Sequence, residues 1–244
     1  MRPFFSTAIV ALVLSLTPAP STAQKVDTIS AGKRRFDRPP RIGVDTLDGF
    51  AIVGDSSRLT YTMIRSTTRA SDGTVEMNTR IGPVQYRSKW KLAPFTPLEF
   101  KTTSLRDSAA ITFSGEFVQG WVVESGKPRA IVEHEFGDDV VPFAGGAGEI
   151  LAQILPLADR YAAAFRVFDP YQNKGEWWSL RVLGSEAVKH HGKPVDCWIV
   201  ETTIPGASIA PTHRLWVAKT NRLVVQDRNM RELPDGRVMI ARAR

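Results

Sequence analysis

The fold is decided by the stretch EILAQILP at residues 149–156, which interrupts a chain otherwise built on a period of two. Its aliphatic residues recur at the spacing of one helix face. Glu149 near the start suits the positive end of a helix dipole, and Pro156 disfavours helical angles for the residue before it. The stretch predicts a short helix, which needs a partner surface to be stable. In this chain that partner must be the face of a sheet.

On both sides of this stretch, apolar and polar residues alternate as in half-buried strands, for example at 59–63 and 75–81. Between these two runs, Asp72-Gly73 is typical of a tight hairpin turn. Further strands are expected at 84–90, 98–103, 110–114, 117–124 and 130–136 before the helix, and at 160–168, 178–182, 195–203, 214–219, 223–228 and 237–241 after it. The predicted fold is therefore mainly β: a curved antiparallel meander, an open or half barrel, with one short helix on its concave face.

The N-terminus has the three parts of a secretory signal peptide. Arg2 precedes the apolar run Ala8–Leu16, and small residues follow as far as Ala23. The apolar run is about half as long as a bilayer-spanning helix requires. We therefore expect residues 1–23 to be a signal peptide and the remaining chain to be an exported, soluble protein, most simply periplasmic.

Residues 24–45 are basic and lack apolar periodicity, so we expect a mobile arm ahead of a single β-rich domain at 46–244. The arm could attach the protein to an anionic membrane surface through Lys33, Arg34, Arg35 and Arg38. A solvated linker is the alternative. With a net charge of +7 the chain is basic overall. Nucleic acid is nevertheless a poor partner, because Phe36 alone could stack on bases and the expected compartment is wrong.

No reactive constellation is visible in the sequence. It contains no Gly-x-Ser-x-Gly nucleophile motif and no phosphate-binding glycine loop. His190 and His191 are adjacent, so on an extended chain they point to opposite faces and lack a third metal ligand. Cys197 is the single cysteine and cannot form an internal disulfide. We therefore expect no enzyme activity, no metal and no cofactor.

The apolar residues suggest a binding role instead. Some of the six tryptophans, together with the apolar side of the helix, could surround a cavity for an apolar ligand. Packing into a filled core is the simpler alternative, and composition does not separate the two. The candidate cavity walls are Ile150, Leu151, Ile154, Phe165, Trp178 and Leu180.

Several segments of the second half carry a family resemblance. They are EILAQILPL (149–157), YAAAF (161–165), LRVLGSEAV (180–188), VDCWIVE (195–201), LWVA (215–218) and LVV (223–225). Together they resemble the DUF3108 family of exported bacterial proteins, strongly over 145–230 and only in strand rhythm over 50–140. That resemblance implies a LolA/LppX-like lipoprotein-carrier fold, an open barrel with a helix in its mouth. It supplies no catalytic residues.

Three functional hypotheses remain open at this stage. The favoured one is an exported, soluble, non-enzymatic protein that binds an apolar or amphipathic ligand, a lipid or lipopeptide, between sheet and helix. The second is a cell-envelope structural or assembly factor that binds a protein partner through a sheet edge or the basic arm, with no small ligand. The third is a hydrolase whose hydroxyl, histidine and carboxylate converge from distant strands.

Overall fold

The structure is a computed structural model that describes residues 26–33, 36, 38–136, 143, 147–203, 213–230, 233 and 236–244. The predicted signal peptide at 1–23 lies outside the described residues, as do Arg34 and Arg35 of the expected basic arm.

The described residues form one sheet of 15 strands and one α-helix. After β1 (Val26–Ile29), a first meander consists of β2 (Gly43–Val53), β3 (Ser56–Arg69), β4 (Thr74–Ile81), β5 (Val84–Leu92), β6 (Phe95–Thr103), β7 (Ser108–Ser114), β8 (Phe117–Val123) and β9 (Ala130–Glu135). Helix α1 (Ala147–Ile154) follows. The second meander consists of β10 (Ala162–Asp169), β11 (Lys174–His190), β12 (Lys193–Thr203), β13 (His213–Ala218), β14 (Val224–Asn229) and β15 (Val238–Ala243).

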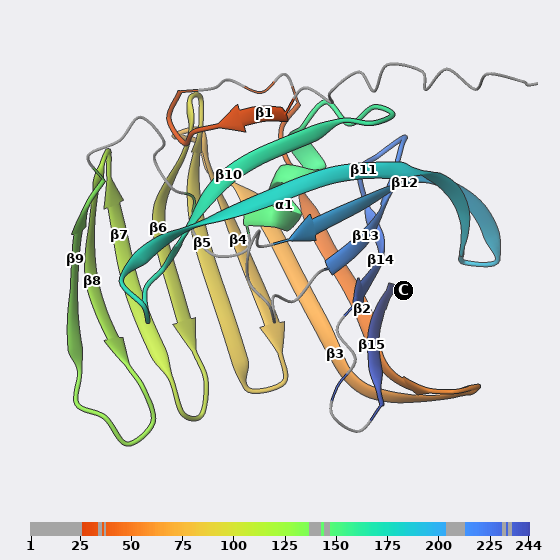
Figure 1. Ribbon diagram of the computed structural model, residues 1–244, viewed down its shortest axis with the longest axis horizontal. Coiled ribbons are helices and arrows are strands. Elements are labelled where there is room, and N and C mark those ends of the chain that lie inside the picture. Colours follow the sequence, from red (N-terminus) through yellow and green to blue (C-terminus); the bar gives the residue numbers. More distant parts are fainter. Residues whose placement is uncertain are drawn as a thin grey trace, which may run out of the picture.

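The two meanders join in the middle of the sheet. The last strand, β15, pairs antiparallel with β2, so that Ile240 lies opposite Phe50. From this junction the sheet runs through β3 to an edge at β9, and in the other direction through β14 to β10 and β1. The sheet is open and strongly curved, and α1 lies inside the curve (Figure 1). The predicted mainly β fold with one short helix is confirmed.

The local turn chemistry also matches the sequence. The hairpin between β3 and β4 turns at Gly73, whose φ of 79° suits a residue without a side chain. The Asp72 carboxylate accepts hydrogen bonds from the Thr74 backbone N–H at 2.9 Å and from the Thr74 hydroxyl at 2.6 Å. The side chain of Asp72 thus closes the turn, as the Asp-Gly signal predicts.

The segment 24–45 contains more regular structure than its composition predicts. Val26–Ile29 forms β1, which pairs in parallel with β10, and Ile29 is buried in the core. Strand β2 already begins at Gly43. The strand partner of β1 lies more than a hundred residues away, so no local pattern in the sequence could reveal the pairing. Lys33 and Arg38 are exposed to solvent.

Six of the eight residues of helix α1 are buried. Ile150, Leu151 and Ile154 are at most 4% exposed, and the Leu155 N–H still donates to the Leu151 carbonyl at 2.9 Å. Each such aliphatic side chain contributes roughly 1.5–3 kcal/mol by burial. Among the described residues, no helix has the length and apolar character needed to cross a lipid bilayer.

A cluster of aromatic side chains packs in the core. Trp90 stacks on Phe95 with ring centroids 5.0 Å apart, and Phe143 packs against both rings. Phe165 meets Phe143 edge-on at 6.1 Å. These rings come from both meanders and from the segment between them, so they hold the two arms of the sheet together at this level.

Candidate functional site: a groove between the two arms of the sheet

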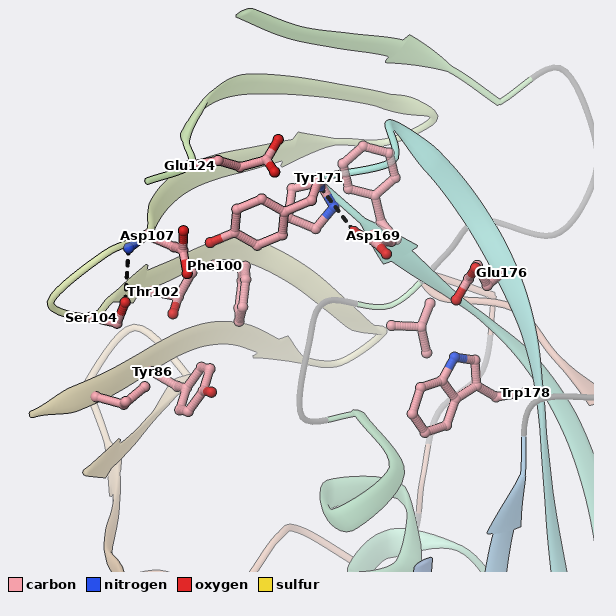
Figure 2. A pocket seen from close by; sticks show the side chains of 14 residues that line it. Tyr86, Phe100, Thr102, Ser104, Asp107, Glu124, Asp169, Tyr171, Glu176 and Trp178 are labelled. Atoms are coloured by element: carbon pink, nitrogen blue, oxygen red, sulfur yellow. Dashed lines mark hydrogen bonds between the residues drawn. The ribbon is translucent and has the colours of Figure 1, made fainter. Parts of the chain in front are cut away.

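A groove of about 620 Å³ opens between the concave face of β5–β8 and the β10–β11 hairpin. Its described lining comes from three places: the strands β5 and β6, the turns that follow β6 and β8, and both strands of the hairpin. Figure 2 shows Tyr86 and Trp178 on opposite sides of the hollow, with Phe100 and Tyr171 between them. The lining residues are Val84, Tyr86, Phe100, Thr102, Ser104, Asp107, Glu124, Val167, Phe168, Asp169, Pro170, Tyr171, Glu176 and Trp178.

Contacts at the tip of the hairpin hold the groove open. The Phe168 ring packs edge-on against Phe113 at 6.3 Å and against Phe136 at 5.8 Å. The Asn173 side-chain amide donates to the carbonyl of Glu133 at 3.3 Å. The hairpin therefore crosses the concave face and is fixed at its far end on β7 and β9, which leaves an uncovered stretch of β5 and β6 beneath it.

The walls of the groove are aromatic and only partly shielded from solvent. Tyr86 and Tyr171 are 39% and 38% exposed, whereas Phe100 at the base is 8% exposed. Burial raises the pKa of the Tyr86 phenol. Burial also raises the pKa of Tyr171, with smaller contributions from the Asp107, Tyr86 and Asp169 side chains. Both phenols therefore stay protonated at neutral pH and can donate hydrogen bonds.

Carboxylates form the rim, and none of the lining residues is Lys or Arg. Glu124 pairs with Lys127 at 2.9 Å and Glu176 pairs with Lys174 at 3.0 Å, with both lysines outside the lining. Asp169 accepts from the Tyr171 N–H at 2.9 Å and so shapes the hairpin turn. The rim carboxylates thus have partners of their own, and the interior surface is mainly apolar.

Two smaller pockets lie next to the groove, beside the first turn of α1. One, of about 200 Å³, is lined by Met63, Arg65, Met77, Thr79, Ile81, Tyr86, Ser88, Phe100 and Glu149. The other, of about 180 Å³, is lined by Ala147, Gly148, Glu149, Val167, Trp178, Thr202, His213 and Leu215. The first shares Tyr86 and Phe100 with the groove, and the second shares Val167 and Trp178. Glu149 borders both small pockets.

A buried ion pair separates the small pockets. The Arg65 guanidinium, on β3 and with a side chain 2% exposed, pairs through Nη2 with Glu149 of α1. The Glu149 side chain is 27% exposed, and it faces the two pockets. Burial raises the pKa of Glu149, although Arg65 opposes this shift. Nearby, His213 Nδ1 lies 3.0 Å from Asp227 Oδ1, and this hydrogen bond raises the pKa of His213.

The six residues predicted to wall a cavity fall into two groups. Trp178 lines the groove. The other five are at most 4% exposed and belong to the main core: Ile150, Leu151, Ile154, Phe165 and Leu180. Three of these five residues belong to α1, and their side chains pack tightly in the core. The groove therefore lies beside the helix, under the β10–β11 hairpin.

Sequence reasoning missed Tyr86, Phe100 and Arg65. The alternation expected in the strand at 84–90 already places Val84, Tyr86, Ser88 and Trp90 on one face, and this face does point inward. Alternation does not show which inward residues are covered. Trp90 is fully buried, and four positions earlier on the same face Tyr86 faces the groove.

Two features concern nucleophilic catalysis and metal binding. Burial raises the pKa of the Cys197 thiol to about 11, so this cysteine stays protonated at neutral pH and is a poor nucleophile. Within the described part of the chain, no group of three or more His, Cys, Asp or Glu side chains could hold a metal ion. The absence of enzyme activity and of a cofactor stays a prediction.

The family follows from a comparison with family models. The model described as "Protein of unknown function (DUF3108)" matches residues 58–240, well over half of the chain. The chain belongs to the DUF3108 family. This match begins in β3 and ends in β15, so the DUF3108 region contains every residue of the groove and of both small pockets.

Comparisons were also made with curated proteins and with solved structures. No curated protein matches the chain significantly. Among solved structures, a DUF1329 family protein from Desulfovibrio piger shares 9% sequence identity, with 84% of each chain covered and a TM-score of 0.24. A score this low carries no argument about fold or function. The resemblance to the lipoprotein-carrier fold therefore stays a prediction.

Proposed function

We propose that this DUF3108 protein binds an apolar or amphipathic molecule, a lipid or a lipopeptide, in the groove and does so without catalysis. The observation that carries the proposal is the hollow of about 620 Å³ between β5–β8 and the β10–β11 hairpin, with aromatic walls. This volume lies within the range of small-molecule sites, which combine apolar walls with a few polar groups. We propose that binding takes place outside the cytoplasm, where the predicted signal peptide would direct the protein.

The groove suits a hydrocarbon chain for a simple energetic reason. Tyr86, Tyr171 and Trp178 leave apolar surface in contact with water. A chain lying between these rings would remove that surface from water and gain about 0.8 kcal/mol for each methylene buried. The hydroxyls of Thr102 and Ser104 also line the groove and offer hydrogen bonds to a polar group of the bound molecule.

A pair of neighbouring substitutions tests the proposal. Val84→Trp fills the groove, whereas Gln85→Trp places the same ring on the opposite, solvent-exposed face of β5. The protein is purified under mild conditions and its bound lipids are measured by native mass spectrometry. We expect lipid in the wild type and in the Gln85→Trp variant, and a loss of about tenfold or more in the Val84→Trp variant. Wild-type protein that stays empty when mixed with lipid would overturn the proposal.

One observation favours a second candidate, a protein partner at the sheet edge. Within the described residues, β9 pairs with β8 on one side only, and its Ile131 is 69% exposed. Such an edge can accept a strand from another protein through its backbone groups. Replacement of Ile131 by Lys, combined with cross-linking in cells, tests this candidate. A cross-linked partner that persists with the lysine in place would contradict docking at β9.

A further inference from the structure

Arg65 has hydrogen-bonding capacity that the described residues do not use. Its side chain is 2% exposed, and Nη2 contacts the Glu149 carboxylate and, at 3.7 Å, the Met63 sulfur. The Nε atom is buried and has no hydrogen-bond partner among the described residues. An unpartnered donor on a charged group costs stability when it is buried. Such a donor leaves room for an acceptor from outside the described part of the chain.

The small pocket beside Arg65 adjoins the groove at two side chains. Tyr86 and Phe100 line both spaces. The wall of the small pocket is otherwise largely aliphatic or weakly polar, with Met63, Met77 and Ile81 around the guanidinium. A ligand that extends from the groove past these two rings would reach an apolar pocket bordered by Arg65.

We propose that Arg65 binds the carboxylate head group of a single-chain amphiphile whose hydrocarbon tail lies in the groove. This inference rests on the proposed function of the groove and specifies the ligand as an anionic amphiphile held head inward. A guanidinium offers several N–H donors in a planar arrangement that matches a carboxylate, and such charge-assisted bonds are the strong ones. The pocket of about 200 Å³ has room for such a head group.

Glu149 is the internal competitor for this head group. It already accepts from Arg65, so a second carboxylate must share or displace it. The charged and titratable groups around Glu149 are Arg65 of β3, His213 of β13 and Asp227 of β14, with Tyr61 of β3 nearby. Removing the charge of Glu149 would free Arg65 for the ligand without changing the shape of the pocket.

The test compares two probes of equal chain length, decanoate and decan-1-ol, by calorimetric titration at pH 7.5. Wild-type protein is expected to bind decanoate at least about tenfold more tightly than decan-1-ol. Glu149→Gln removes the competing carboxylate. This variant is expected to bind decanoate about tenfold more tightly than the wild type does, with no change in the affinity for decan-1-ol. In the neutral double variant Arg65→Met/Glu149→Gln, the two probes should bind equally. Arg87→Met, on the exposed outer face of β5, is the matched control and should change neither affinity.

The outcomes separate the two proposals. Decan-1-ol binding without any preference for decanoate in the wild type would overturn the role of Arg65 and leave the groove proposal standing. Failure of both probes to bind the wild type would overturn the groove proposal itself. If the double variant does not fold, the single Glu149→Gln variant decides, because unchanged decanoate affinity there contradicts a carboxylate on Arg65.

Discussion

Two regions of the concave face differ sharply in how they are filled. Around α1, Leu151, Trp90 and Phe95 are at most 1% exposed, and aromatic rings from both meanders interlock. Under the β10–β11 hairpin, Tyr86 and Tyr171 remain 39% and 38% exposed around an open groove. An eight-residue helix covers only part of the curve of a 15-stranded sheet. The β10–β11 hairpin covers another part, and the groove lies where neither the helix nor the hairpin packs on the sheet.

This contrast separates the residues that stabilise the core from the residues that line an open groove. A dry void would forfeit the dispersion contacts that make a core stable. The groove avoids that cost by staying open to water through a rim of paired carboxylates. Substitutions should accordingly be costly near α1 and tolerated under the hairpin.

The largest effect is expected at the boundary between the regions. Arg65→Met leaves the Glu149 carboxylate without its partner and should lower the free energy of unfolding by about 4 kcal/mol. The double variant Arg65→Met/Glu149→Gln should recover most of that loss, because no buried charge remains. Urea unfolding followed by tryptophan fluorescence measures both. Equal destabilisation by the single and double variants would show that the ion pair is not the cause.

The next prediction compares the two regions directly. Leu151→Ala, in the filled region, should lower the free energy of unfolding by about 3 kcal/mol, because it removes methyl groups from a close-packed core. Tyr171→Ala, in the groove wall, should cost less than about 1 kcal/mol, because its ring is packed on one side only. The same urea titrations apply. Similar costs at both positions would contradict the distinction between a filled and an open region.

A smaller effect is expected from pH. The hydrogen bond that His213 donates to the Asp227 carboxylate raises the pKa of His213 above its unfolded value, so the folded state favours the protonated ring. The stabilisation is full below about pH 6.5, the unfolded pKa, and is lost as the pH rises through the higher folded pKa. The free energy of unfolding should fall between pH 6 and pH 8, by about 0.5 kcal/mol after allowance for solvent screening. His213→Asn should flatten this dependence.

The smallest effect is expected at the rim. Lys127 is 64% exposed and pairs with Glu124. Lys127→Ala should change the free energy of unfolding by less than about 0.5 kcal/mol, because exposed ion pairs contribute little. Thermal unfolding measures this change. A larger loss would show that the rim of the groove contributes to the free energy of unfolding. That result would contradict the conclusion that the filled region around α1 provides most of the stability.

Sequence reasoning succeeds here where the signal is local. The alternation around Met63 and Met77 predicts strands, and the aliphatic spacing of Ile150 and Ile154 predicts the helix. It fails where partners are distant in sequence. The pairing of β1 with β10 and the ion pair of Arg65 with Glu149 each join positions more than eighty residues apart.

In the candidate site, too, the sequence predicts local properties but not distant contacts. Trp178, predicted to wall a cavity between sheet and helix, lines the groove under the hairpin instead, and the five aliphatic and aromatic residues predicted beside it are packed in the core. An apolar side chain has the same pattern in the sequence whether it faces a neighbour or a hollow. Only the path of the β10–β11 hairpin across β5 and β6 decides which of these inward positions stay uncovered.

The sequence by itself determined that this DUF3108 protein is built of β-strands with one short helix, because periods of two and of 3.6 are properties of consecutive residues. The tertiary structure decided how the sheet curves, where the groove lies and that a buried arginine lines the small pocket next to it. These features depend on how far the helix reaches and on where the hairpin tip is fixed. Both are set by contacts between residues remote in the chain.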